Sequence, residues 1–124
     1  MKYLWLVALL TSSIPLAHAA QGQCVLPVPD GADIEPSPAS LSGRLVHVQP
    51  GRVVVRLRRG KDIAVQVNPQ TDLFTAYGGG VELHELEVGQ YASVWLKGCA
   101  KPGKTSALAV YLELCSLAPE PCPK

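Results

Sequence analysis

The residues best suited to bind a ligand are arginines that alternate with apolar residues near the middle of the chain. Arg52, Arg56 and Arg58 lie at even positions, separated by valines and a leucine. With the odd-numbered residues inward, these arginines point outward, and His47 on the preceding strand, beside Val54, shares that face. Guanidinium groups suit phosphate, sulfate and carboxylate groups. The pattern therefore predicts an anion-binding face, although the solvated side of an antiparallel sheet has the same composition.

A second candidate surface is aromatic. Tyr91, Trp95 and Tyr111 are expected on the outward side of the last two strands, with Trp95 opposite the small Ala109. Such rings could stack on a sugar or on an apolar side chain of a partner. They could equally pack beneath the proline-rich N-terminal arm, so the sequence leaves both roles open.

Catalytic and metal-binding patterns are missing from the sequence. Beyond residue 19 the histidines are His47 and His84, and neither has a metal ligand or a catalytic base at motif spacing. No nucleophile elbow is present. The arginine-rich stretch also lacks the interleaved aromatic residues that stack on bases. We therefore expect a protein that is not an enzyme, uses no cofactor or metal, and does not bind nucleic acid.

The first residues resemble a secretory signal peptide. Residues 1–19 contain a basic start, an apolar run at 4–10 and the small-residue cleavage site Ala17-His18-Ala19. The apolar run is far shorter than the ~20 residues that a membrane-spanning helix needs. We therefore expect a mature chain that starts at Ala20, has no transmembrane segment, and is exported to the periplasm or the extracellular space.

Four cysteines follow the leader, an even number that implies two disulfides in an exported chain. Three pairings are possible. Cys99 and Cys115 lie at opposite ends of the last expected hairpin, roughly 30 Å apart at ~3.3 Å per residue, whereas a disulfide needs Cα atoms within ~7 Å. Cys122 is only seven residues past Cys115 and reaches at most ~25 Å back, which disfavours a bond to Cys99 as well. The preferred pairs are therefore Cys24–Cys99 and Cys115–Cys122.

The periodicity of apolar residues divides the rest of the chain. A proline-rich arm covers residues 20–40, a β-barrel domain residues 41–115, and a proline-rich tail residues 116–124. Turns at Pro50-Gly51 and at Arg59-Gly60-Lys61 join the first three strands. The glycine inside the first strand, Gly43, suggests a bulge or a sharp bend. The expected partners are Val48 with Val53, Val46 with Val55, Leu57 with Ile63, Val55 with Val65, Arg58 with Asp62, Val94 with Val110, and Leu96 with Leu108.

The element order is three strands, a short helix or 3-10 turn at 81–86, and two further strands at 90–97 and 105–114. This order predicts a mainly β fold, a small OB-like five-stranded antiparallel barrel with one short helix between strands three and four. A β-meander packed on one helix is the alternative.

Several core and turn residues resemble a known group of domains. They are Gly43-x-Leu45, the Val-Val-Val strand, Ile63-x-Val65-x-Val67, Thr71, Leu83-x-x-Leu86-x-x-Gly89-Gln90-x-x-Ser93-Val94 and Ser106-Ala107-Leu108-x-Val110. The pattern, over residues 41–114, is similar to small secreted bacterial OB-like β-barrel domains of unknown function. The resemblance implies a barrel and export, and it implies no particular chemistry.

The charge of the chain does not identify a partner. Of 11 basic and 10 acidic residues, Lys2 lies in the leader, which leaves ten of each. The basic residues nevertheless cluster in the first hairpins. We therefore expect an exported non-enzymatic binding or accessory module whose basic sheet face meets an anionic envelope component or a protein. The alternative is a structural assembly subunit that uses the aromatic surface around Trp95.

Overall fold

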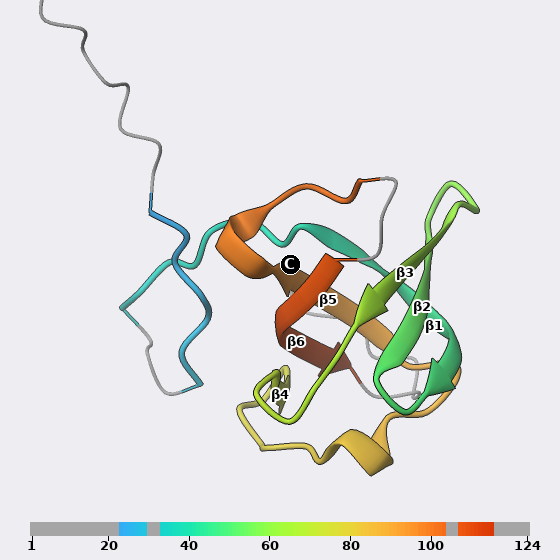
Figure 1. Ribbon diagram of the computed structural model, residues 1–124. Helices are drawn as coiled ribbons and strands as arrows, with labels where there is room; N and C mark the ends of the chain where they lie inside the picture. The colour runs from blue at the N-terminus through green and yellow to red at the C-terminus, as the bar shows by residue number, and fades with distance from the viewer. Residues whose placement is uncertain (1–22, 30–32, 104–106, 116–124) are drawn as a thin grey trace, which may run out of the picture.

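The computed structural model describes residues 23–29, 33–103 and 107–115. Within these ranges the chain forms six strands and two single-turn 3-10 helices (Figure 1). In chain order the elements are β1 (Leu41–Gln49), β2 (Arg52–Leu57), β3 (Asp62–Gln66), β4 (Asp72–Thr75), η1 (Leu83–Glu85), β5 (Tyr91–Leu96), η2 (Lys97–Cys99) and β6 (Ala107–Cys115). The predicted leader and tail lie outside the described residues.

Five of the strands close into a barrel. They follow the order β3-β2-β1-β5-β6, and a pairing between β3 and β6 completes the ring. This mainly β arrangement fits the OB-like label, but the prediction of a purely antiparallel barrel is wrong because β3 and β6 are parallel. A ring with an odd number of strands cannot alternate in direction all the way around. One parallel pair is therefore a geometric requirement of five-strand closure.

The first hairpin follows the predicted turn. Gly51 has φ 79°, the positive value that a type II turn needs at this position. Val48 pairs with Val53 as predicted, but Val55 pairs with Leu45 and not with Val46. The reason is a β-bulge at Val46, which shifts the register by one residue along β1.

Gly43 is not the site of that bulge, and its role is close packing. A Cβ atom at this position would overlap the backbone carbonyl oxygen of Arg56. The two backbones therefore approach each other more closely than any side chain would allow.

The second hairpin closes one residue earlier than predicted. Its loop is Arg58-Arg59-Gly60, with φ 88° at Gly60, and the amide of Leu57 donates to the carbonyl of Lys61 at 2.9 Å. Each partner on β3 is therefore displaced by two residues, so that Asp62 lies opposite Arg56 and not opposite Arg58. Because a two-residue displacement preserves the alternation of faces, Val53, Val55 and Val65 remain fully buried.

β4 was not predicted. The chain leaves the sheet after β3 and then returns to pair with β6 in the parallel direction, from Asp72 opposite Tyr111 to Thr75 opposite Leu114. In the intervening loop the buried hydroxyl of Thr71 donates to the carbonyl of Ala109 at 2.8 Å. This side-chain hydrogen bond contacts β6 between the stretch that pairs with β3 and the stretch that pairs with β4.

The prediction of a short helix between strands three and four is also wrong, because the described residues contain no α-helix, and the 3-10 turn that was its alternative forms in its place. Residues 83–85 form one 3-10 turn, in which Glu82 and Glu85 make a capping box. Leu86 already has extended dihedral angles, φ −66° and ψ 131°, so the helix cannot continue. The turn nevertheless brings Leu86 into the core, with Leu83 packed at its edge.

In the last hairpin the inward side of β5 is as predicted, since Ala92, Val94 and Leu96 are buried. The predicted partners are wrong, because Val94 faces Leu112 and Leu96 faces Ala109. A bulge at this point buries Ala109, whereas Leu108 and Val110, the predicted partners of Leu96 and Val94, are only half-buried. The core cluster consists of Leu41, Leu45, Val53, Val55, Val65, Val67, Leu73, Leu86, Ala92, Val94, Leu96, Ala109, Leu112 and Leu114.

The described part of the N-terminal arm, residues 23–29 and 33–40, lies against the outside of the barrel (Figure 1). A disulfide between Cys24 and Cys99 attaches it, as predicted. Cys115 is also disulfide-bonded, while its expected partner, Cys122, lies outside the described residues. In the described ranges, no helix is both long enough and apolar enough to span a membrane.

Candidate functional site

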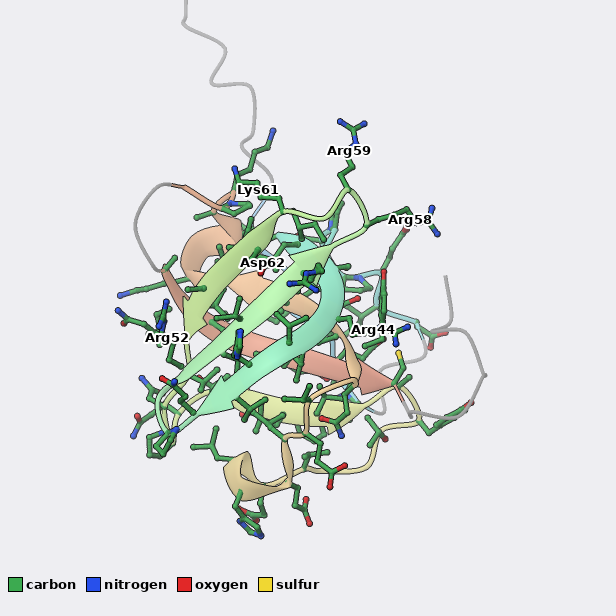
Figure 2. The ribbon with its side chains drawn as sticks, turned by 90° about the vertical axis from the view of Figure 1, so that its right-hand side faces the viewer. Arg44, Arg52, Arg58, Arg59, Lys61 and Asp62 are labelled. Atoms are coloured by element: carbon green, nitrogen blue, oxygen red, sulfur yellow. A yellow bond between two sulfur atoms is a disulfide. The ribbon has the colours of Figure 1, made fainter. Side chains whose placement is uncertain are left out.

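The outer surface of β1, β2 and β3 carries most of the predicted anion-binding residues. Strand pairing arranges the outward side chains in three rows that cross the strands. Figure 2 views this surface with its charged side chains drawn. We call it the basic face and define it by Arg44, His47, Gln49, Arg52, Val54, Arg56, Asp62, Ala64 and Gln66.

The bulge in β1 determines which residues share this face. Arg44 and His47 are three positions apart, so in a regular strand they would point to opposite sides. The extra residue at Val46 lets both point outward, and both are exposed. Arg44 was therefore missed by strict alternation, and no turn or composition signal marked the bulge.

Arg56 at the centre of the face is already engaged. Its Nε donates to Oδ1 of Asp62 at 2.8 Å and its Nη2 donates to Oδ2 at 3.1 Å. The side-chain hydrogen bond from Arg56 lowers the pKa of Asp62, and the same bond raises the pKa of Arg56. This two-bond pair neutralises the predicted ligand Arg56, so an incoming anion would have to compete with Asp62.

A shallow depression of about 280 Å³ lies at one end of the basic face. His47, Gln49, Arg52 and Val54 line it. Among the described residues, the Arg56–Asp62 pair is the one ion pair, so the guanidinium of Arg52 remains available. The depression combines a free cation, an imidazole and an amide, groups that can all donate hydrogen bonds to an anion.

Arg58 lies elsewhere than predicted. β2 ends at Leu57, and Arg58 belongs to the following turn. Figure 2 shows Arg58 and Arg59 projecting from the hairpin tip, with Lys61 nearby and Arg52 toward the opposite end of the hairpin. The structure therefore brings Arg52 together with His47 in the depression, and it does not place Arg58 on the basic face.

The predicted aromatic surface is largely covered. Trp95 and Tyr111 are 5% and 3% exposed. Trp95 lies opposite Tyr111 and not opposite Ala109, and the two rings meet edge to face with centroids 5.6 Å apart. Phe74 stacks on Tyr111 at 5.5 Å. Of the three predicted aromatic residues, Tyr91 alone is half-buried and accessible.

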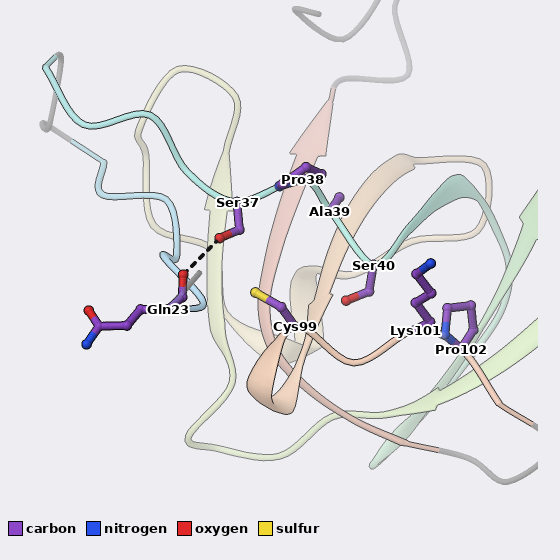
Figure 3. Close-up of a pocket in the computed structure, with 8 residues that line it drawn as sticks. All are labelled: Gln23, Ser37, Pro38, Ala39, Ser40, Cys99, Lys101 and Pro102. Atoms are coloured by element: carbon purple, nitrogen blue, oxygen red, sulfur yellow. Dashed lines mark hydrogen bonds between the residues drawn. The ribbon is translucent and has the colours of Figure 1, made fainter. Parts of the chain in front are cut away.

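The arm supplies that cover. Ser37 is its central contact, because its hydroxyl accepts from the Val25 amide at 2.8 Å and its carbonyl accepts from the Trp95 indole. Figure 3 shows the adjacent pocket, about 660 Å³, between the arm and the residues around Cys99. There the Ser37 hydroxyl also donates to the Gln23 carbonyl at 3.4 Å. Packing beneath the arm is therefore what the structure shows for Trp95.

The described residues provide no metal centre. In them, no cluster of three or more His, Cys, Asp or Glu side chains is close enough together to hold an ion. His47 lies on the basic face, and His84 lies in η1. The structure does not bring the two histidines into one site.

Comparison with known proteins identified no relative: no family model, no curated protein and no solved structure matches the chain. The similarity to secreted OB-like domains therefore stays a prediction.

Proposed function

We propose that the protein is an exported, non-enzymatic binding or accessory module whose basic face meets an anionic envelope component or an acidic protein surface. The observation that carries this proposal is the depression in which Arg52, free of an ion pair among the described residues, lies beside His47 and Gln49. A disulfide and a leader-like sequence are compatible with export.

The composition of the face favours an anion over other ligands. Arg44 and Arg52 are exposed cations, and the row between them is formed by His47, Val54 and Ala64. Carboxylate, sulfate and phosphate groups accept the hydrogen bonds that a guanidinium donates. The nine residues of the face include no aromatic side chain on which a base could stack, and the ring beside it is that of Tyr91 on β5, opposite Arg44. A single ring at the edge differs from the interleaved aromatic residues of single-stranded nucleic-acid binding proteins, which argues against nucleic acid.

The assembly hypothesis receives less support. It requires an accessible surface around Trp95, and the arm occupies that surface. A partner would have to displace a segment held by hydrogen bonds and a disulfide.

The test is retention on an anionic matrix at low ionic strength. Arg44→Gln combined with Arg52→Gln should elute at markedly lower salt than the parent protein, because two cations of the face are lost. Lys97→Gln combined with Lys101→Gln is the matched control, since it removes the same charge from a different surface. Equal elution of the two double variants would show that net charge, and not the basic face, governs retention.

A further inference from the structure

A small pocket of about 210 Å³ lies between the arm and the edge of the barrel formed by β4 and β6. Pro27, Pro29, Ile34 and Pro36 line its arm side, and Tyr111 and Glu113 line its barrel side. We call it the arm pocket. It is built from different strands than the basic face and does not depend on the function proposed for that face.

The walls of the arm pocket accept hydrogen bonds and offer few donors. Its three prolines have carbonyl oxygens but no N–H. On the barrel side the N–H groups of Thr75, Ala76 and Gly78 are all engaged, with the carbonyls of Gly79, Leu114 and Thr75 respectively, at 2.7–2.9 Å. A ligand that fits these walls must therefore bring donors of its own.

Glu113 supplies a negative charge to the same pocket. It is half-buried on the outward side of β6, between Ser93 on β5 and Phe74 on β4. No basic side chain in the described parts of the chain forms an ion pair with it. Burial raises the pKa of Glu113, which is the behaviour of a carboxyl group that lacks a compensating cation.

Tyr111 adds a second oxygen. Burial raises the pKa of Tyr111 to about 12, and the carboxylates of Glu113 and Asp72 contribute further. Its hydroxyl therefore stays neutral across the physiological range, and an incoming N–H group finds a neutral oxygen beside a charged one. The prolines and Ile34 complete the pocket with apolar surface.

We propose that the arm pocket binds an alkylammonium group, with the carboxylate of Glu113 as its counter-ion and the prolines and Ile34 around its methylene stem. A primary ammonium carries three donors and a full positive charge, which match an acceptor-lined, acidic wall. Two sources share this chemistry: a free amine and the side chain of a lysine on a partner protein.

The experiment is an NMR titration of the protein with pentylamine, monitored at the backbone amides of residues 75–78 and 111–113. We expect saturable shifts with a dissociation constant in the millimolar range for so small a ligand. Pentanol, which has the same stem without the charge, should produce none. Equal shifts with pentanol would overturn the proposal, since binding would then be apolar only.

Variants locate the site. Glu113→Gln keeps the shape and should weaken pentylamine binding about tenfold or more, the effect of losing a charge-assisted hydrogen bond. The matched control is Glu87→Gln, which removes an exposed carboxylate from the loop between η1 and β5 and should leave binding as in the parent. An unchanged affinity in folded Glu113→Gln protein would refute the assignment.

One further ligand distinguishes the two sources. A short peptide with blocked termini and a central lysine is compared with pentylamine at the same residues. Tighter binding of the peptide indicates a lysine on a protein, and tighter binding of pentylamine indicates a free amine. Absence of binding by both would reject the pocket as an ammonium site while leaving the basic face untouched.

Discussion

The indole N–H of Trp95 donates to the carbonyl oxygen of Ser37 at 2.7 Å, which joins the C-terminal end of β5 to the N-terminal arm. A buried indole needs an acceptor, and here the acceptor comes from a segment 58 residues earlier in the chain. The arm thereby belongs to the folded unit as a covering layer over the aromatic residues of β5 and β6.

Removal of the Cys24–Cys99 disulfide should loosen this layer. In a chain that starts at Ala20, Trp95 is the sole tryptophan, so its emission reports on the arm directly. Cys24→Ser with Cys99→Ser should shift the emission to the red. For a loop of 75 residues the chain-entropy model predicts a loss of about 4.5 kcal/mol in unfolding free energy. An unchanged spectrum would mean that the hydrogen bonds alone hold the arm.

Gly43→Ala should destabilise the barrel by roughly 1–3 kcal/mol, because the new methyl group overlaps the carbonyl of Arg56 and forces β1 and β2 apart. Urea unfolding measures the loss. Gly80→Ala is the matched control, since nothing lies within 4 Å of the added Cβ, and we expect a change below about 0.5 kcal/mol. Similar losses in both variants would refute close packing at Gly43 as the cause, because the entropy effect of replacing glycine by alanine favours the folded state at both positions.

Thr71→Val should cost roughly 1–3 kcal/mol by leaving the buried carbonyl of Ala109 without its hydroxyl donor. Thr71→Ser keeps the hydroxyl and should lose less. Thermal or urea unfolding of the pair separates the hydrogen bond from the packing. If the serine variant were the less stable of the two, the methyl group would be the more important part of the side chain.

The pKa of Asp62 should lie below its ordinary value of 3.8, since the hydrogen bond from Arg56 favours the carboxylate. A lowered pKa in the folded state stabilises the protein above the unfolded pKa, and this contribution disappears as the pH falls through the folded value. NMR titration of the Asp62 carboxyl measures the shift directly. In Arg56→Gln the pKa should return toward 3.8, and a pKa that stays low would implicate another cation.

Glu113 should behave in the opposite sense. Its raised pKa means that the folded state holds the proton more tightly than the unfolded state, so stability declines as the pH rises through the titration range of this group. Glu113→Gln should therefore equal or slightly exceed the parent in stability at neutral pH, by roughly 0.5 kcal/mol or less for a partly exposed site. Denaturant unfolding at pH 4 and pH 7 checks the sign. A variant that is less stable at neutral pH would reveal a partner for the carboxylate.

Turn chemistry and alternation were enough to predict much of the barrel. Pro50-Gly51 located the first turn, and the inward valines of β2 follow from a period of two. The disulfide between Cys24 and Cys99 followed from distances along the last hairpin. These features depend on local geometry or on chain length, and both can be read from a sequence.

Features that depend on contacts between distant segments were missed. The bulge at Val46 has no local marker, yet it places Arg44 and His47 on one face. Thr71 joins the loop before β4 to β6 through its side chain, and β4 itself pairs with β6, a strand far along the chain. Because these contacts are between distant segments, periodicity could not reveal β4. Asp62 was assigned to Arg58 because a two-residue displacement of the hairpin leaves the apolar pattern unchanged.

The position of Cys99 in the chain has a consequence for the order of assembly. Cys99 precedes β6, so the covalent loop that it closes with Cys24 contains β1 to β5 and leaves β6 outside. β6 is also the strand that pairs with β3, β4 and β5 and thereby completes the ring. In a chain that emerges with its N-terminus first, Cys24 and Cys99 both emerge before β6. The disulfide between Cys24 and Cys99 can therefore form while the sheet is still open, before β6 pairs with β3 and closes the barrel.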